Sequence, residues 1–540
     1  MRPNVSCVVI VLCVFALVPS MWAQVEVSPS HMGVPQDWST HHILFSRDTV
    51  AQHPEMMNDP RVRYQAMQRW HSQSSQVSPD TAQATSAINN SSNSDWNVSL
   101  VKGHVSANMY PAKYSFDPSL APSCLNDYVV FGIAASGVTG GQANLIGFNN
   151  LYSGTAPSLC TRTTPTVKFA YNVTTVAGGK ILTSPVISYD GTKIAFVEST
   201  TTASIFHVLT INNLGSITVS ASGASTMTSV TFSSATSTLS SPWVDYAADV
   251  AYVGADDGKI YKITSVFHGT PTVASSGGFP VTVTLNDRLT SPVLDSIQGL
   301  LMVGSGNGSL YQINASSGAY SLLAVGKGTY SQIKAPPMVD ITNGTTFVVS
   351  ANDGTSAVLV EADTSTLGQL AKVRLGSGGH GATSALYLYE PAFDNNYYNY
   401  VPPNPNNGYV HVCGTNPTVP TDYSPYQYSI GFTGAIMNTT PAFSQQLLPS
   451  TAARCTDWTE FYNPNIGGGT DFFFFGLTQD CTGATTLGCV VTMTNNTSLT
   501  FTPINGGPSG IQVDNYSTAP QASSIYFTAE KANTAYKLPQ

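Results

Sequence analysis

The sequence is poor in charged residues. Only 9% of its 540 residues are Asp, Glu, Lys or Arg, against roughly a quarter in an average soluble domain. The formal net charge is −9, and no stretch gathers lysines and arginines. The chain therefore lacks the basic surface with which proteins hold nucleic-acid phosphates, and we expect no nucleic-acid partner.

Long hydrophobic runs are missing as well. The first 23 residues combine Arg2, an apolar stretch over 8–18 and a small residue, Ala23, before a plausible cleavage point, which is the pattern of a secretory signal peptide. The apolar stretch is too short to span a bilayer, and no later run reaches the eighteen or so residues that a span needs. We expect a mature protein that is secreted or periplasmic, with no membrane span.

Cysteine is scarce, and no pair has the C-x-x-C spacing of zinc or haem sites. Two of the eight cysteines fall in the signal peptide. An even number in an exported chain favours disulfides, and the strand order below predicts the pairs Cys124–Cys160, Cys413–Cys455 and Cys481–Cys489. No metal site is expected.

Familiar catalytic motifs are also absent, since neither G-x-S-x-G nor H-E-x-x-H occurs. Five of the ten histidines lie before residue 72, at irregular spacings: His31, His41, His42, His53 and His71. We interpret them as surface or partner-facing residues rather than metal ligands.

What the chain does contain is a repeat. Residues 239–263 (LSSPWVDYAADVAYVGADDGKIYKI) return as residues 289–313 (LTSPVLDSIQGLLMVGSGNGSLYQI). Strand, turn and strand at a fixed period are typical of a β-propeller blade. We predict an all-β fold, an eight-bladed β-propeller (seven blades being the alternative) over residues 96–540. Its inner strands are expected at Lys113–Asp117, Ser184–Ser188, Ser241–Asp245, Ser291–Asp295, Pro336–Asp340, Glu390–Asp394, Thr459–Asn463 and Ile511–Asn515.

The chain before the repeats has a different composition. Residues 24–72 are expected to form a short N-terminal extension with one helix, Pro60–Trp70, which Asn58 or Asp59 can cap. Residues 73–95 are a polar, low-complexity linker. Residues 96–100 alternate as a strand and should pair with Ala535–Leu538 to close the ring, because an unpaired edge invites aggregation. On this interpretation, residues 24–90 are dispensable for folding.

Several recurring features have structural explanations. An Asp ends the inner strand at Asp245, Asp295, Asp340 and Asp394, and we favour turn formation over a cation-binding ring. The D-G and N-G pairs are read as hairpin turns. The phenylalanines of 472–475 are expected to be core between blades.

One loop departs from the repeat and is our candidate for ligand binding. It carries Tyr397, Tyr398 and Tyr400, followed by three prolines. Exposed tyrosines suit stacking on sugar rings or gripping a protein. The competing interpretation is that these side chains cover the edge of the blade.

The phrases TSPVISYDGTKIAFVES and SSPWVDYAADVAYVGADDGKIYKI resemble the repeats of TolB-like and PQQ-like (quinoprotein-type) propellers. Together with DWSTHHILFS and MYPAKYSFDP, they make the chain similar to a group of secreted bacterial proteins of unassigned function. Quinoprotein dehydrogenases carry a Trp motif in each blade, an adjacent Cys pair and a calcium site. This chain has six Trp and no adjacent cysteines, so no cofactor or catalytic residue is carried over and no cofactor is expected.

These observations favour an exported, non-catalytic propeller that acts as a binding or scaffold module for a cell-envelope protein or polysaccharide. We expect a monomer. The alternative is a polysaccharide lyase or glycoside hydrolase with its site at a propeller rim, and a PQQ-like dehydrogenase is a remote third interpretation.

Overall fold

The computed structural model describes residues 33–71, 95–107, 109–118, 120–154, 158–212, 219–221, 226–378, 390–402, 404–464, 466, 468–514 and 521–539. The signal segment, His31, His380 and nearly all of the linker lie outside these residues. Within them, no helix is both long and apolar enough to cross a membrane.

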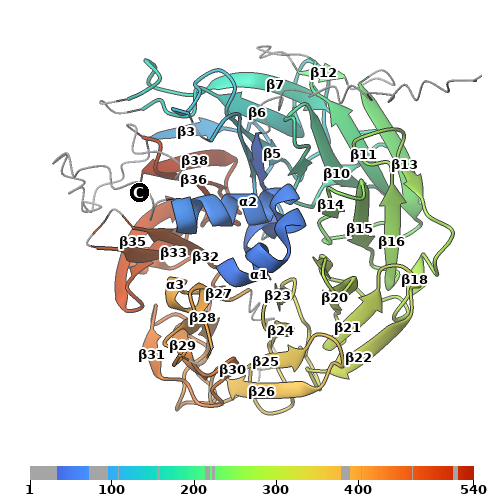
Figure 1. Ribbon diagram of the computed structural model, residues 1–540. Coiled ribbons are helices and arrows are strands. Elements are labelled where there is room, and N and C mark those ends of the chain that lie inside the picture. Colours follow the sequence, from blue (N-terminus) through green and yellow to red (C-terminus); the bar gives the residue numbers. More distant parts are fainter. Residues whose placement is uncertain are drawn as a thin grey trace, which may run out of the picture.

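The protein is an eight-bladed β-propeller, as the repeats predict (Figure 1). The strands of the first four blades are β4 (Ala112–Ser115), β5 (Tyr128–Gly132), β6 (Leu145–Asn149), β7 (Thr166–Asn172) and β12 (Ser220–Ala221); β8 (Lys180–Ile181), β9 (Val186–Ile187), β10 (Lys193–Ser199), β11 (Ser204–Thr210) and β13 (Met227–Ser233); β14 (Trp243–Asp245), β15 (Val250–Gly254), β16 (Lys259–Thr264), β17 (Thr272–Val273) and β18 (Val281–Thr282); and β19 (Val293–Asp295), β20 (Leu300–Gly304), β21 (Ser309–Asn314) and β22 (Tyr320–Ala324).

The remaining blades follow the same order from the channel outward. Their strands are β23 (Met338–Asp340), β24 (Thr345–Ser350), β25 (Val358–Asp363) and β26 (Gln369–Arg374); β27 (Ala392–Phe393), β28 (Tyr409–Gly414), β29 (Tyr426–Thr433), β30 (Ile436–Met437) and β31 (Phe443–Gln446); β32 (Thr459–Asn463), β33 (Thr470–Leu477), β34 (Leu487–Thr494) and β35 (Ser498–Asn505); and β36 (Gln512–Asp514), β37 (Ser524–Thr528), β38 (Thr534–Pro539) and β3 (Trp96–Ser99). A short helix, α3 (Asn395–Tyr398), follows β27, and a 3₁₀ turn, η4 (Cys481–Gly483), precedes β34.

The turn after the inner strand depends on its terminal Asp. Asp245 Oδ1 accepts hydrogen bonds from the backbone N–H groups of residues 247 and 248. Asp295 and Asp340 bond the N–H groups two and three residues ahead in the same way. These are Asx turns, in which a short carboxylate replaces a backbone acceptor. The structural interpretation of the recurring Asp is confirmed.

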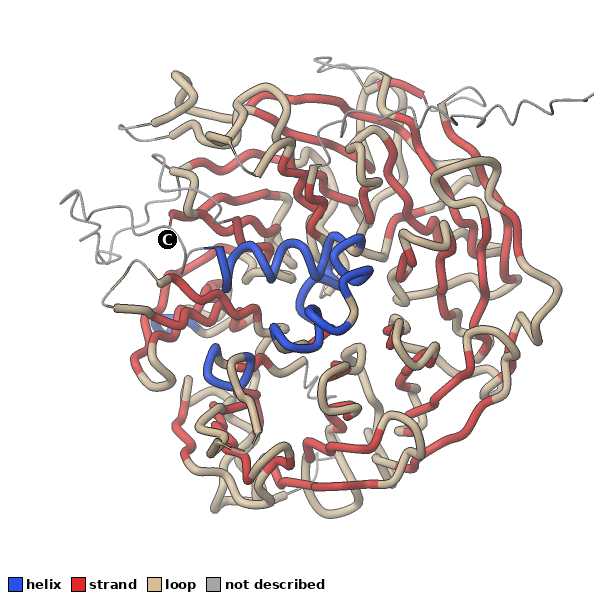
Figure 2. The backbone as a smooth tube through the Cα atoms, viewed as in Figure 1, coloured by secondary structure: helices blue, strands red, loops and turns tan. Residues whose placement is uncertain are grey.

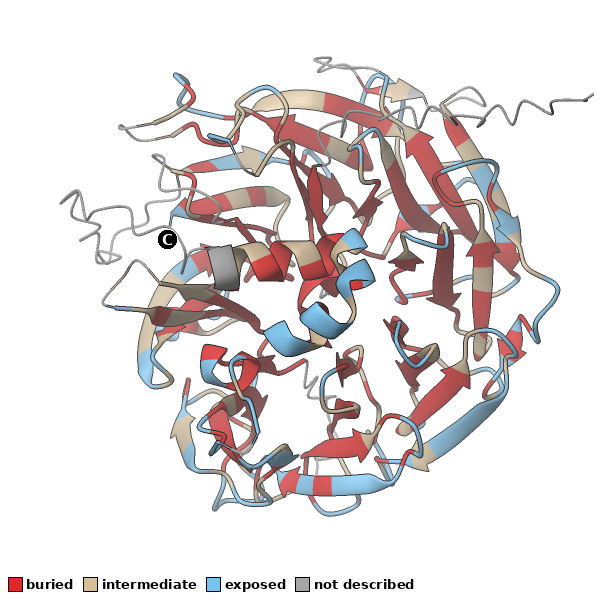
Figure 3. Cartoon of the chain, in the orientation of Figure 1, coloured by how far each residue is buried: buried red, intermediate tan, exposed pale blue. Residues whose placement is uncertain are grey.

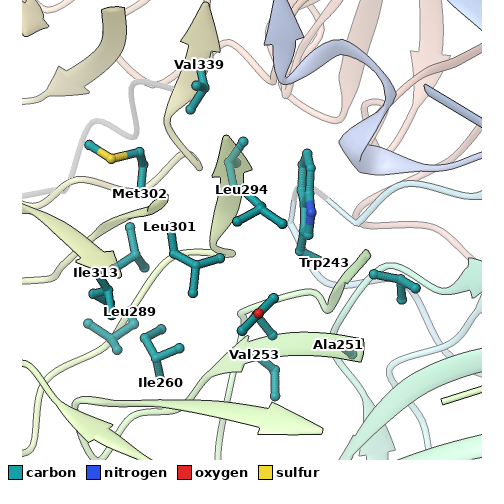
Figure 4. Packing of buried hydrophobic residues seen from close by; sticks show 14 of the residues in the cluster. Trp243, Ala251, Val253, Ile260, Leu289, Leu294, Leu301, Met302, Ile313 and Val339 are labelled. Atoms are coloured by element: carbon teal, nitrogen blue, oxygen red, sulfur yellow. The ribbon is translucent and has the colours of Figure 1, made fainter. Parts of the chain in front are cut away.

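The core lies between the blades. Middle strands are buried on both faces and outer strands only in part (Figure 3). Between blades three, four and five, for example, Trp243, Val253, Leu294, Met302 and Val339 pack in one cluster (Figure 4). The run 472–475 is core as expected, with three of its four phenylalanines at most 2% exposed.

The ring closes where the sequence predicts. Strand β3 pairs antiparallel with β38, with Trp96 opposite Lys537 and Ser99 opposite Thr534. The blade at the end of the chain thus receives its outer strand from before the first blade. Trp96 is 2% exposed, and its Nε1 donates to the carbonyl of Leu151, 3.1 Å away in blade one.

The three predicted disulfides are present: Cys124–Cys160, Cys413–Cys455 and Cys481–Cys489. The first two disulfides join residues 36 and 42 positions apart. Cys124–Cys160 lies within blade one, and Cys413–Cys455 joins a strand of blade six to the segment before blade seven. The third joins η4 to β34. The pairing confirms the strand order from which it was predicted.

Residues 33–71 lie across the centre of the ring, and we call them the N-terminal plug (Figures 1 and 2). Its elements are β1 (Val34–Gln36), η1 (Trp38–His41), β2 (Ile43–Leu44), α1 (Arg47–Gln52), η2 (Pro54–Asn58), α2 (Pro60–Ala66) and η3 (Met67–His71). The helix predicted from Pro60 is α2, and Asp59 caps it by accepting from the N–H of Arg61.

The plug joins blades on opposite sides of the channel. Strand β1 extends blade one by pairing with β4, and β2 pairs parallel with β23 of blade five. Trp38 Nε1 donates to the carbonyl of Pro242 at 3.1 Å, and Tyr64 donates to that of Val513 at 3.2 Å. The expectation that this extension is dispensable for folding is at odds with the structure, because the plug supplies strands and buried side chains to the propeller itself.

Candidate functional site

The Ser-Pro motif of the repeat builds a hydrogen-bonded arc around the channel. The backbone N–H of Tyr110 donates to Ser184 Oγ at 2.9 Å, that of Ser184 to Ser241 Oγ at 2.9 Å, and that of Ser241 to Ser291 Oγ at 2.7 Å. Each bond links one blade to the next. Because all four residues stand directly before an inner strand, the repeat places them side by side on the channel wall.

Other residue types occupy the same position in the remaining blades. Alignment of the inner strands puts Pro336, Glu390 and Asp457 where the serines stand. Asp457 still serves as the link, since its Oδ1 accepts from the N–H of Glu390 at 3.1 Å. Tyr110, which opens blade one, donates its hydroxyl to Glu390 Oε1 at 3.1 Å across the channel.

The plug completes this group with His42. Its Nε2 contacts Glu390 Oε2, and its Nδ1 lies 2.9 Å from the carbonyl oxygen of Trp38. Since a carbonyl only accepts, Nδ1 carries the ring proton and Nε2 presents its lone pair to Glu390. The glutamate thus receives one hydrogen bond from Tyr110 and faces a base on its other oxygen.

Burial sets the protonation of the group. It lowers the pKa of His42 to about 4 and raises the pKa of Glu390 well above its ordinary value. The pKa of Asp457 is also well above normal, first from burial and then from the neighbouring Glu390. Desolvation penalises the charged form of each group, so burial shifts all three toward their uncharged forms.

Above this group lies a cavity of about 180 Å³, which we call the channel cavity. Trp38 and His42 of the plug line it, and both are buried. Apolar side chains of Met109, Leu182, Leu289 and Ile333 line its wall among the serines. Ala107 and Leu239 line it too and are exposed to solvent, so the cavity opens where the inner strands begin.

Two cationic side chains line the cavity on the side of blades four and five. Arg288 is 41% exposed, and its Nη2 lies 3.5 Å from Asp256 Oδ2. Lys334 precedes the inner strand of blade five. Burial, and then the charge of Arg288, lower the pKa of Lys334, while Asp256 and Asp287 oppose that shift. The cavity therefore has a cationic side, and a protonated carboxyl side formed by Glu390 and Asp457.

The tyrosines of the predicted binding loop lie elsewhere. Tyr397 is 4% exposed and donates to Asp340 Oδ2 at 2.6 Å, while Tyr398 is 6% exposed and stacks under the Arg69 guanidinium at 3.5 Å. Tyr400 is half-buried. None of the three lines the channel cavity. The expectation that the loop presents three exposed tyrosines is wrong for two of them, because they pack against the plug and blade five; ligand binding by this loop stays a prediction.

The sequence pattern did not identify His42, Glu390 or Asp457 as members of a site. The two acids could have been found from the sequence, because alignment of the repeats on the Ser-Pro motif places a carboxyl side chain at the position that serine occupies in the other blades. The histidine had no such signal. His41 and His42 were expected to be surface or partner-facing residues, yet both are buried, because the plug lies across the centre of the ring (Figure 1). Among the described residues, no group of three or more metal-ligating side chains occurs.

Comparisons with known proteins add little. No protein-family model and no curated protein sequence matches the chain. Solved structures similar to it include BamB of Moraxella catarrhalis, with 12% identity over 82% of this chain and 98% of that one (TM-score 0.43), and a putative 6-phosphogluconolactonase of Bacteroides fragilis, with 10% identity over 70% and 94% (TM-score 0.39). A quinohemoprotein alcohol dehydrogenase of Pseudomonas putida matches at 14% identity over 47% and 40% (TM-score 0.31). At these values the neighbours carry no argument about function.

Proposed function

We propose that the protein is an exported binding module without a catalytic role, and that the channel cavity receives the end of a cell-envelope polysaccharide. The observation that carries the proposal is the plug. The plug lies across the centre of the ring (Figure 1), and its Trp38 and His42 line the cavity, so we expect a terminal unit or a small molecule to enter rather than a polymer that threads through the channel. Three disulfides suit the oxidising compartment outside the cytoplasm.

The protonation of the cavity floor favours binding over hydrolysis. Glycosidases generally use two carboxyl groups, of which one is ionised and acts as nucleophile or base. Here burial raises the pKa of both Glu390 and Asp457 well above normal, and Asp457 is engaged by the N–H of Glu390. Neutral carboxyl groups keep lone pairs that accept hydrogen bonds, which suits recognition of sugar hydroxyls.

The test is a glycan array on the mature protein, followed by titration calorimetry on the glycans that bind. Leu239 is 36% exposed and lines the cavity mouth, so Leu239→Trp should fill the mouth and abolish binding. Leu285 is 78% exposed and does not line the cavity, so Leu285→Trp is the matched control and should bind as the parent does.

Two results would count against the proposal. Glycan binding that survives Leu239→Trp would place the ligand outside the cavity, and binding of an envelope protein alone would mean a different partner. A reducing-end assay on each bound glycan separates the hydrolase and lyase alternative, since any steady release of product would show catalysis.

A further inference from the structure

The two sides of the channel cavity differ in hydrogen-bonding character. The side formed by blades two to five carries the hydroxyls of Ser184, Ser241 and Ser291 together with Arg288 and Lys334. Among the described lining residues, the only carboxyl groups are Glu390 and Asp457, both on the opposite side, in blades six and seven. A ligand in the cavity therefore meets donors on one side and neutral acids on the other.

The three serines are available as donors. Each Oγ already accepts a hydrogen bond from a backbone N–H of the preceding blade, and for Ser184 this donor is Tyr110. A hydroxyl carries one hydrogen besides its acceptor sites, and among the described residues none of these three hydroxyls donates a hydrogen bond. The serines are between 1% and 6% exposed, so an acceptor for them has to come from something inside the cavity.

The cations reinforce the same preference. The Nε of Arg288 is buried with no hydrogen-bond partner among the described residues, and the guanidinium has five N–H donors in all. Lys334 lies close enough to Arg288 for that charge to lower its pKa. The Nη2 of Arg288 already lies 3.5 Å from Asp256 Oδ2, so the donors that remain for a ligand are the Arg288 Nε and the three O–H groups. These donors favour an acceptor such as a carboxylate, and a planar carboxylate matches the guanidinium.

The opposite side offers hydrogen-bond acceptors to hydroxyl groups, because the Tyr110 hydrogen is donated to Glu390 and the Glu390 proton faces His42 Nε2, which leaves only lone pairs for a ligand. Tyr110, Glu390 and His42 form a buried, uncharged chain of hydrogen-bonding groups at the inner end. A volume of about 180 Å³ equals that of about six liquid waters at roughly 30 Å³ each, which limits the occupant to one small unit. The cavity thus combines a side in blades two to five that suits a carboxylate with a side in blades six and seven that suits hydroxyl groups.

We propose that the channel cavity binds a sugar carboxylate, a uronate, either as the terminal unit of a polysaccharide or as the free sugar acid. This rests on the proposed function, which places the ligand in the cavity, and it adds the chemical class. The carboxylate lies toward Arg288, Lys334 and the serine hydroxyls, and the ring hydroxyls lie toward Glu390 and Tyr110.

The experiment is titration calorimetry of the mature protein with glucuronate and galacturonate, an oligogalacturonate, and the neutral sugars glucose and galactose. Uronates should bind about tenfold more tightly or better than neutral sugars, because a charged hydrogen bond is stronger than a neutral one. Tighter binding of the oligomer than of the monomer identifies a chain end as the ligand, and equal binding identifies the free acid.

Arg288→Gln supplies the decisive variant, because it removes the charge from a side chain that is 41% exposed and should leave the fold intact. It should weaken uronate binding about tenfold or more and leave neutral sugars unaffected. Arg374→Gln is the matched control, since Arg374 is exposed at the end of β26 and does not line the cavity.

Uronate binding that is undetectable, no tighter than that of neutral sugars, or unchanged in Arg288→Gln overturns the inference. The proposed function fails differently. If neutral glycans bind and Leu239→Trp abolishes that binding, the cavity is still the site and only the carboxylate class is wrong.

Discussion

The contact between Arg69 and Glu460 offers the sharpest test of how the plug is held. Arg69 is 4% exposed and Glu460 3%, and the guanidinium contacts both carboxylate oxygens. The same guanidinium donates to Asn395 Oδ1 at 2.9 Å and covers the Tyr398 ring. Arg69→Met keeps most of the side-chain length but leaves the Glu460 charge buried without its partner.

Removing one member of a buried ion pair costs about 3–5 kcal/mol, mainly because the other charge stays desolvated. With an m-value of about 3 kcal/mol/M or more for a chain of this size, the midpoint of urea unfolding should fall by about 1 M. Glu460→Gln should cost less, because an amide remains a neutral hydrogen-bond partner. The double variant Arg69→Met/Glu460→Leu should recover most of the loss, since it removes both charges.

An exposed pair provides the control for this measurement. Lys259 is 38% exposed and lies 3.9 Å from Asp257, so Lys259→Met should change the free energy of unfolding by less than about 1 kcal/mol. If Arg69→Met were no more destabilising than this control, or if the double variant lost the sum of the two single losses, the plug would not be held by a buried ion pair.

Four further predictions follow from particular contacts. Trp96→Ala should destabilise the ring by about 3–5 kcal/mol, measured by chemical denaturation; a loss under 1 kcal/mol would mean that β3 does not lock the ring. Non-reducing peptide mapping should recover the three disulfides in the pairing described, each contributing about 2–4 kcal/mol, and any crossed pair would refute the strand order. Burial raises the pKa of Asp471 from 3.8 to about 9, so the contribution of its protonated form to folding stability is complete below pH 3.8 and is lost as the pH rises toward 9. Asp471→Asn should therefore raise the melting temperature at pH 8 relative to the parent, and the difference should shrink at pH 4. Equal melting curves of variant and parent at both pH values would show that the carboxyl is ionised throughout. Tyr400→Ala should leave glycan binding unchanged if the channel cavity is the site. If Tyr400→Ala lost glycan binding while Leu239→Trp still bound glycans, the binding site would be the tyrosine loop.

The blades could be predicted from the sequence because their determinants are local. The Ser-Pro motif, the terminal Asp of the inner strand and the tight turns with Gly258 and Gly308 at positive φ all act within a few residues of their own position. The disulfide pairs followed from the strand order, since each joins residues at most 42 positions apart. These local features together were enough to assign eight inner strands.

The plug and the channel cavity could not be predicted in this way. Trp38 meets Pro242 across 204 positions, and Arg69 meets Glu460 across 391. No periodicity in residues 33–71 indicates either contact, and the scarcity of charge gives no electrostatic pattern to match. The buried tyrosines were misjudged for the same reason, because the surface that covers Tyr397 and Tyr398 comes from other parts of the chain, Asp340 and Arg69.

The parallel pairing of β2 with β23 also constrains the order of assembly. Residues 43–44 are synthesised early but pair with residues 339–340. Arg69 likewise contacts Glu460, which lies in the seventh blade. Loop closure over such distances has a high entropic cost and slows folding. The apolar and cationic side chains of the plug therefore lack their partners while most of the ring is still being made.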